Sequence, residues 1–150
     1  MGSFHLAQFN VGRLRHPLDA QAMTDFVAGL GPINALADRT PGFVWRYTGE
    51  GRDDATHEDP YGDQTIIVNF SVWETRDQLW NFAYRSEHMD YLRRRREWFS
   101  RIAELDQVLW WTPAGTTPTV QEAMRRLDLV REKGPTADAF TFRKFFDPPL

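Results

Sequence analysis

Alternating apolar and polar side chains recur in four segments of the chain. In residues 64–74 the side chains at even positions share one face of an extended strand, and those at odd positions share the other. A similar alternation runs through residues 4–11, 43–48 and 108–112. Because a period of two is typical of strands with two distinct faces, these segments predict a four-stranded sheet.

Two longer segments repeat their apolar side chains every three to four positions. Residues 20–38 and 75–99 show this period, which is typical of amphipathic helices. The Gly31-Pro32 pair should kink or restart the first helix, because proline has no backbone N–H to donate. Ser86 can cap a following turn and should restart the second helix.

Beyond the fourth strand, the pattern adds a helix and a tail. Thr119 is placed to cap the start of the helix, and Gly134 is placed to end it. Residues 139–146 alternate well enough to form a short added strand. Residues 50–63, between the second and third strands, are acidic and contain glycine and proline. We expect them to form an exposed loop that the fold does not need.

The order of these elements is β-α-β-β-α-β, followed by the extra helix and the tail strand. This is the split βαβ pattern, and it predicts one α+β domain over residues 1–150 with a ferredoxin-like antiparallel sheet. The two helices should cover one face of the sheet, and we expect nothing in the chain to cover the other. An uncovered apolar face favours a partner, so we predict a homodimer that packs sheet against sheet.

Composition and charge restrict the partners of this domain. A formal net charge of −3 gives no general attraction to nucleic acid. The absence of cysteine excludes disulfides, thiolate nucleophiles and cysteine-ligated metals. No apolar run approaches the roughly 20 residues of a membrane helix, and the first residues lack the pattern of a signal peptide. We therefore expect a cytoplasmic protein without a membrane partner.

Aromatic side chains make up 14% of the chain, including six Trp and eleven Phe. Such side chains fill protein cores, and they also line pockets for flat ligands. This content favours a hydrophobic small molecule as the ligand. The sequence contains no glycine-rich phosphate loop, so nothing in it indicates a nucleotide ligand.

Four long segments, in this order, resemble the DUF3291 family of uncharacterised bacterial proteins: LAQFNVGRLRHPLD, INALADRTPGFVWR, VNFSVWETRDQLWNFAYRSEHMDYLRRRREWF and VLWWTPAGTTPTVQEAM. The family is similar to the dimeric α/β barrel superfamily, which includes antibiotic-biosynthesis monooxygenases. Some members of that superfamily oxidise polycyclic aromatic substrates without metal or flavin, and others bind haem. The resemblance therefore implies a dimeric α/β barrel, and it supports the fold more than any one reaction.

Strand alternation places Asn69, Ser71 and Trp73 on one sheet face. The resemblance implies that an Asn, a Trp and an Arg surround the aromatic substrate, and Asn69, Trp73 and Arg93 match this set. The amide can hold a substrate oxygen, the indole can stack or donate, and the guanidinium can stabilise an enolate. The alternative is that Ser71 to Glu74 form only a structural strand end.

The four consecutive arginines at 93–96 are the most visible charge feature. Successive residues on a helix are about 100° apart, so the four side chains point almost all the way round. At least one must turn toward the sheet or a partner and needs a carboxylate there. Nearby carboxylates in the sequence belong to Glu87, Asp90, Glu97 and Glu104. The alternative is a solvated helix whose arginines pair with these acids.

His88 completes the candidate catalytic set of Asn69, Trp73, His88 and Arg93. It could act as a general base, ligate haem or pack as a hydrogen-bonded core residue. The other histidines are scattered, so we expect no metal site built by the protein. The candidate substrate-binding residues are Trp45, Ser71, Tyr84, Trp98 and Trp110.

Two classes of function fit these features. The first is a cofactor-independent monooxygenase, isomerase or cyclase acting on a hydrophobic aromatic small molecule, of the kind found in secondary metabolism. The second is a dimeric protein that binds such a molecule without converting it, since the sequence shows no strong acid-base pair. A haem-dependent enzyme is a weaker third alternative, although we expect no cofactor.

Overall fold

The computed structural model describes residues 3–49, 54–56 and 58–150. The strands are β1 (Phe4–Leu14), β2 (Phe43–Arg46), β3 (Ile66–Trp73), β4 (Phe99–Ser100) and β5 (Gln107–Pro113). The helices are the short 3₁₀ helix η1 (Gln21–Met23) and the α-helices α1 (Thr24–Asp38), α2 (Arg76–Arg85), α3 (His88–Arg93), α4 (Arg95–Trp98) and α5 (Val120–Lys133).

The strands form one antiparallel sheet with β1 and β3 at its centre. β2 pairs with the outer side of β3, and both β4 and β5 pair with the other side of β1. This strand order is the ferredoxin-like βαββαβ arrangement that the sequence pattern predicted, with β4 as a short addition. None of the helices in the described ranges is long and apolar enough to cross a membrane.

Helix boundaries follow the predicted capping residues. The Thr119 hydroxyl accepts a hydrogen bond from the Glu122 N–H at 3.1 Å, and α5 ends at Gly134 with φ 74°. Ser86 separates α2 from α3, and its hydroxyl accepts from the His88 N–H at 3.1 Å. The restart expected at Gly31-Pro32 is wrong, because α1 continues through this pair on its exposed side, where water can reach the carbonyl that proline leaves without a partner.

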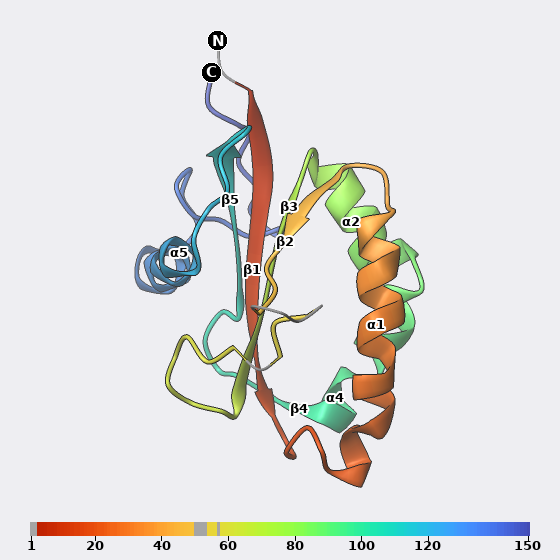
Figure 1. The fold of residues 1–150 in the computed structure, drawn as a ribbon. Helices are drawn as coiled ribbons and strands as arrows, with labels where there is room; N and C mark the ends of the chain where they lie inside the picture. Colours follow the sequence, from red (N-terminus) through yellow and green to blue (C-terminus); the bar gives the residue numbers. More distant parts are fainter. Residues whose placement is uncertain (1–2, 50–53, 57) are drawn as a thin grey trace.

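Two layers cover the sheet, one on each face. α1 to α4 lie on one side, and α5 lies on the other (Figure 1). The C-terminal segment reaches the α2 side, where Phe142 lies 5.1 Å from Trp80 between ring centroids. Ala123, Leu127 and Val130 of α5 are buried in one cluster with Phe9 and Phe70 of the sheet. Our expectation that nothing in the chain covers the second face is therefore wrong, because the extra helix packs there.

The C-terminal tail does not form the strand expected over residues 139–146. Phe140 makes one antiparallel bridge to Leu109, with backbone hydrogen bonds of 2.8 and 2.9 Å. The chain then turns, and the Trp111 indole N–H donates to the Phe146 carbonyl at 2.8 Å. The alternating phenylalanines of the tail pack onto a second core cluster around Leu109 and Trp73, so their spacing reflects packing and not a strand.

The connection between β2 and β3 packs more closely than expected for an exposed loop. Residues 50–53 and 57 lie outside the described residues. Of the others, Ala55 is buried, Tyr61 packs against the main core cluster, and the Tyr47 hydroxyl donates to Glu58 at 3.0 Å. The expectation of an exposed loop is therefore wrong for this described part, whereas its dispensability for folding stays a prediction.

Two glycines of α1 test how closely the helical layer is packed. A Cβ on Gly29 would overlap the ring of Tyr91, whereas a Cβ on Gly31 would meet nothing within 4 Å. We expect Gly29→Ala to lower the free energy of unfolding by about 1–3 kcal/mol, despite the better helix propensity of alanine. Gly31→Ala should raise it by about 0.5–1 kcal/mol. Urea unfolding of both variants measures the difference, and equal effects would contradict the close contact between α1 and α3.

Candidate functional site

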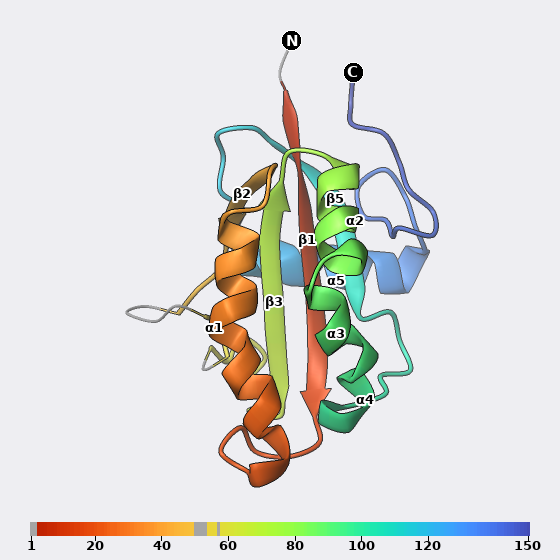
Figure 2. The same ribbon diagram turned by 90° about the vertical axis from the view of Figure 1, so that its right-hand side faces the viewer.

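A cavity of about 640 Å³ lies between the sheet and the layer formed by α1 to α4. Residues of β3 and β1 form its floor. Figure 2 shows these strands running between α1 on one side and α2, α3 and α4 on the other. Leu30 and Ile33 of α1 supply an aliphatic wall. Asn10 and Asn69 supply polar groups on the floor. An apolar cavity with a few convergent polar groups is the usual form of a small-molecule site.

The pleat of β3 decides which predicted residues reach this cavity. Asn69, Ser71 and Trp73 all line it, as the shared strand face predicted. The other row of β3 side chains, including Phe70, points to α5 and belongs to the main core cluster. The face with the polar residues is therefore the face covered by the helices.

A hydrogen-bond network beneath the floor fixes these side chains. Gln8 of β1 is 3% exposed, and its Nε2 donates to Asn69 Oδ1 at 2.6 Å and to Ser71 Oγ at 2.9 Å. The Trp73 Nε1–H donates to the same hydroxyl at 2.9 Å. Gln8 holds the oxygen end of the Asn69 amide, and no described residue holds the NH₂ end, which can therefore donate to a ligand.

Trp73 serves the core and the cavity together. It is 1% exposed, its ring stacks on Phe82 at 5.2 Å between centroids, and Phe43 meets it edge-on at 5.5 Å. Its indole N–H is already used by Ser71. Trp73 therefore forms a buried part of the cavity wall, and it offers a ligand neither a free donor nor an exposed ring face.

His88 lies at the start of α3, half-buried against Phe82 and in the cavity wall. Its Nδ1 is 2.9 Å from the Ala83 carbonyl oxygen, which can only accept, so the ring hydrogen is on Nδ1. Burial lowers the pKa of His88 below its usual 6.5, against the smaller opposing effect of this hydrogen bond. At neutral pH the ring is uncharged, and the Nε2 lone pair can accept a proton.

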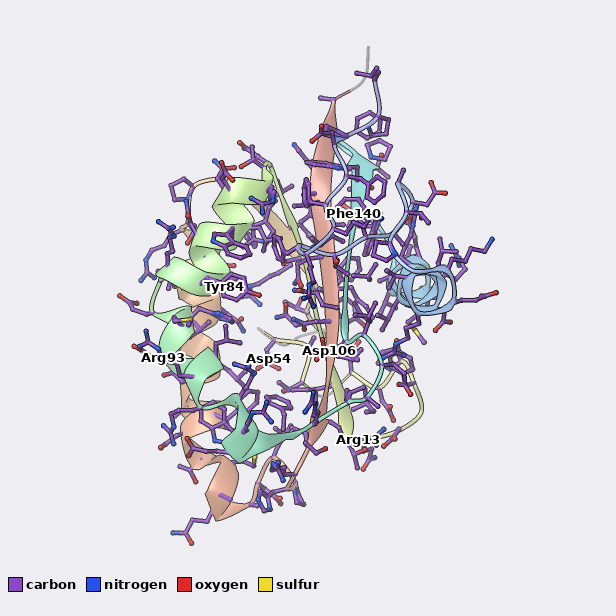
Figure 3. All side chains as sticks on the ribbon, turned by 180° about the vertical axis from the view of Figure 1, so that it is seen from behind. Arg13, Asp54, Tyr84, Arg93, Asp106 and Phe140 are labelled. Atoms are coloured by element: carbon purple, nitrogen blue, oxygen red, sulfur yellow. The ribbon has the colours of Figure 1, made fainter. Side chains whose placement is uncertain are left out.

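Tyr84 of α2 also lines the cavity, on the side of the helices, while Asp106 approaches from the sheet (Figure 3). Burial raises the pKa of the Tyr84 hydroxyl; the Arg95 charge lowers it and the Asp106 charge raises it, both less strongly. The hydroxyl is therefore protonated at neutral pH and can donate to a ligand.

The structure divides the four arginines between two environments. Arg93 lies on the outer side of α3 (Figure 3), with its side chain 68% exposed and Asp90 at 3.6 Å. Arg94 pairs with Asp25 at 3.0 Å and with Glu97 at 2.8 Å. Arg95 and Arg96 line the cavity, and Arg93 does not. All four side chains are nevertheless exposed. The expectation of an arginine that turns inward to a carboxylate is therefore wrong, and the alternative of a solvated segment paired with nearby acids fits Arg93 and Arg94.

Three predicted tryptophans lie outside the cavity lining. Trp45 and Trp110 belong to the opposite face, where their rings lie 5.0 and 5.8 Å from Phe70. Trp98 is 1% exposed and packs against Phe26 at 5.4 Å. Aromatic content alone does not distinguish the two faces of a sheet, and this is why these residues were grouped with the others.

Several lining residues were not predicted. Asn10 shares one face of the first strand with Gln8, which lies beneath the lining, and this polar pair could have indicated a polar floor. Leu30 and Ile33 are ordinary members of an apolar helix stripe, so nothing in the sequence marks them as cavity residues. Arg101 lies beyond the last helix turn, where periodicity gives no orientation.

The histidine is the main group to consider for a metal or haem. In the described ranges, no group of three or more His, Cys, Asp or Glu side chains could hold a metal ion. Haem needs only one axial ligand, and His88 Nε2, with Nδ1–H on a backbone carbonyl, has the usual arrangement for that role. The donor set thus fits an axial ligand.

Comparisons with known proteins identify a family and a fold. The sequence profile of the DUF3291 family, a domain of unknown function, matches residues 5–150. No curated protein matches the chain. The crystal structure of PA3566 from Pseudomonas aeruginosa is similar with a TM-score of 0.50 and 12% identity, over 77% of this chain and 99% of that one. A putative antibiotic biosynthesis monooxygenase from Nitrosomonas europaea has a TM-score of 0.42 and 12% identity, over 77% of this chain and 92% of that one.

The lowered pKa of His88 predicts a specific loss of stability in acid. The unfolded chain binds a proton near pH 6.5 while the folded chain resists it, so this contribution is present above pH 6.5 and falls as the pH drops through the folded pKa. We expect the melting temperature to decline between pH 7 and 5, and His88→Gln to remove part of that decline. The exposed His16→Gln should keep it. The same decline in all three proteins would contradict a buried neutral imidazole.

Proposed function

Because the chain belongs to the DUF3291 family, for which no function is described, we propose its function from the cavity: it binds a hydrophobic aromatic small molecule and oxidises it as a cofactor-independent monooxygenase. One observation carries this proposal. A neutral imidazole in one wall and a fixed amide in the floor line the same cavity, together with apolar side chains.

The size and walls of the cavity support the choice of ligand. Its volume of about 640 Å³ lies within the roughly 300–1,000 Å³ of typical small-molecule sites. Leu30 and Ile33 offer aliphatic contact from α1, and Phe82 offers aromatic contact from α2. A planar molecule of two or three fused rings fits such walls better than a sugar or a nucleotide.

The polar groups support an oxidation that starts with proton removal. In a substrate whose CH₂ group lies between two aromatic rings that are conjugated with a ketone, His88 Nε2 takes one proton. The Asn69 NH₂ group holds the resulting enolate oxygen. The enolate passes electrons to O₂, a C–O bond forms, and loss of water leaves a ketone. The balance is R₂CH₂ + O₂ → R₂C=O + H₂O, and the proton on His88 leaves in the water.

A homodimer belongs to the same proposal, on the resemblance to dimeric α/β barrels. Since α5 covers the sheet face that was expected to pair, this interface must include α5 or lie at another surface. Light scattering at micromolar concentration measures the mass directly, and a monomer would contradict this part alone.

Anthrone, a tricyclic ketone with one activated CH₂ group, tests the reaction. We expect the protein to consume O₂ and form anthraquinone faster than the spontaneous oxidation, as followed by an oxygen electrode and absorbance. His88→Gln should reduce the rate by about 10²–10⁴-fold, the usual contribution of a general base. His16→Gln is the matched control, because that histidine is exposed and outside the cavity lining.

The same measurements separate the alternatives. Quenching of tryptophan fluorescence by anthrone without any O₂ uptake above the spontaneous rate would replace the enzyme with a binding protein. A Soret band after loading with haem, lost in His88→Gln, would favour the haem-dependent alternative. Absence of both binding and turnover would refute the proposed function.

A further inference from the structure

Two of the four consecutive arginines at 93–96 have no carboxylate partner among the described residues. Arg93 and Arg94 pair with carboxylates and lie outside the cavity lining. Arg95 donates only to the Leu92 carbonyl oxygen at 2.9 Å. Arg96 has no ion pair or hydrogen bond with any residue that the structure describes. Of the four arginines in this run, the two that line the cavity are thus the two without an acidic partner among the described residues.

Arg101 adds a third cation to the same part of the cavity. It follows the short strand β4, directly after α4, and it lines the cavity without an acidic partner in the described part of the chain. All three arginines are exposed, so they form the rim of the cavity and not its buried interior. We call Arg95, Arg96 and Arg101 the arginine rim.

The charges around the cavity favour an anion even though the protein is acidic. Four arginines line it, and the described lining has two aspartates, Asp54 and Asp106. The fourth arginine, Arg46, pairs with Asp38 at 2.7 Å. The chain as a whole carries a net charge of −3, so the local excess of positive charge is opposite in sign to that of the protein.

We propose that the ligand is an aromatic carboxylic acid, with its carboxylate held by the arginine rim and its ring system inserted between α1 and the sheet. This inference rests on the proposed function for the occupancy of the cavity, and it adds the chemical class of the ligand. Guanidinium groups match a carboxylate in shape and can donate two parallel hydrogen bonds. The rings then lie toward Leu30, Ile33 and Trp73, and the polar groups of the rings reach Asn69 and His88.

A phosphate ester fits the same rim less well. Phosphate sites generally use the N–H groups of a glycine-rich loop or a helix N-terminus together with cations. The rim has no such loop in the described residues, and α4 has only four residues. The planar carboxylate is therefore the anion that this rim favours.

A matched pair of ligands isolates the charge. 6-Hydroxy-2-naphthoate and its methyl ester share the ring and the hydroxyl group and differ in the negative charge. We expect the wild-type protein to bind the acid about tenfold or more tightly than the ester in a fluorescence titration, with the difference shrinking as salt is added. The double variant Arg96→Gln/Arg101→Gln should lose this preference and bind the ester as the wild type does. Arg93→Gln is the control from the same run and should keep the preference.

The outcomes distinguish this inference from the function beneath it. If the ester binds and the acid binds no more tightly, the arginine rim does not recognise a carboxylate, while the cavity remains a ligand site. If the double variant keeps the preference, the rim is also wrong. If neither ligand binds and anthrone does not bind either, the proposed function itself fails. Circular dichroism of each variant checks folding, and the exposed positions of both arginines favour intact folds.

Discussion

Phe70 and Ser71 are neighbours in the chain, yet they face opposite layers of the molecule. The pleat of β3 sends Phe70 toward α5 and Ser71 toward the cavity, and the antiparallel register with β1 extends the same division to Phe9 and Gln8. A slip of one residue in this register would place the polar row in the apolar core and the apolar row in the cavity. The site and the core therefore both depend on the same pairing of β1 with β3.

The surroundings of the buried side chains differ between the two rows of the sheet, and this difference follows from the division. On the α5 side the sheet residues meet a continuous apolar cluster, with Phe9 and Phe70 edge-to-face at 5.7 Å. On the helix side, Gln8 is also buried, and its amide N–H groups donate to Asn69 and Ser71. A buried amide is tolerated there because its partners satisfy it, and it holds the floor of the cavity rigid.

The sequence predicted the structure correctly where the position of a residue alone determines its geometry, as in strand alternation and helix capping. Alternation in residues 64–74 placed Asn69, Ser71 and Trp73 on one face, and Thr119 and Gly134 marked the ends of the last helix. It was uninformative where tertiary packing made the choice. Trp45 and Trp110 were assigned to the pocket because periodicity gives the faces of a strand and not which layer covers each face.

The arginine run shows the same limit at the level of single residues. An unbroken helical pitch required an inward arginine, but the segment breaks into α3 and α4 between Arg93 and Arg95. The requirement therefore does not hold, and all four arginine side chains are exposed. In the tail, the alternating phenylalanines predicted a strand that does not form. The chain turns after Phe140, and the phenylalanines alternate because they pack onto the core cluster around Leu109 and Trp73.

Gly29 has a consequence for the relatives of this chain. The ring of Tyr91 occupies the space that any side chain at position 29 would need, so the distance between α1 and α3 is set by a missing methyl group. Both residues line the cavity. During evolution, the size of the residue at position 29 would therefore control the width of the cavity. A homologue with a larger residue there must move α1 away from α3, and it would then accommodate a thicker ligand on an otherwise unchanged sheet.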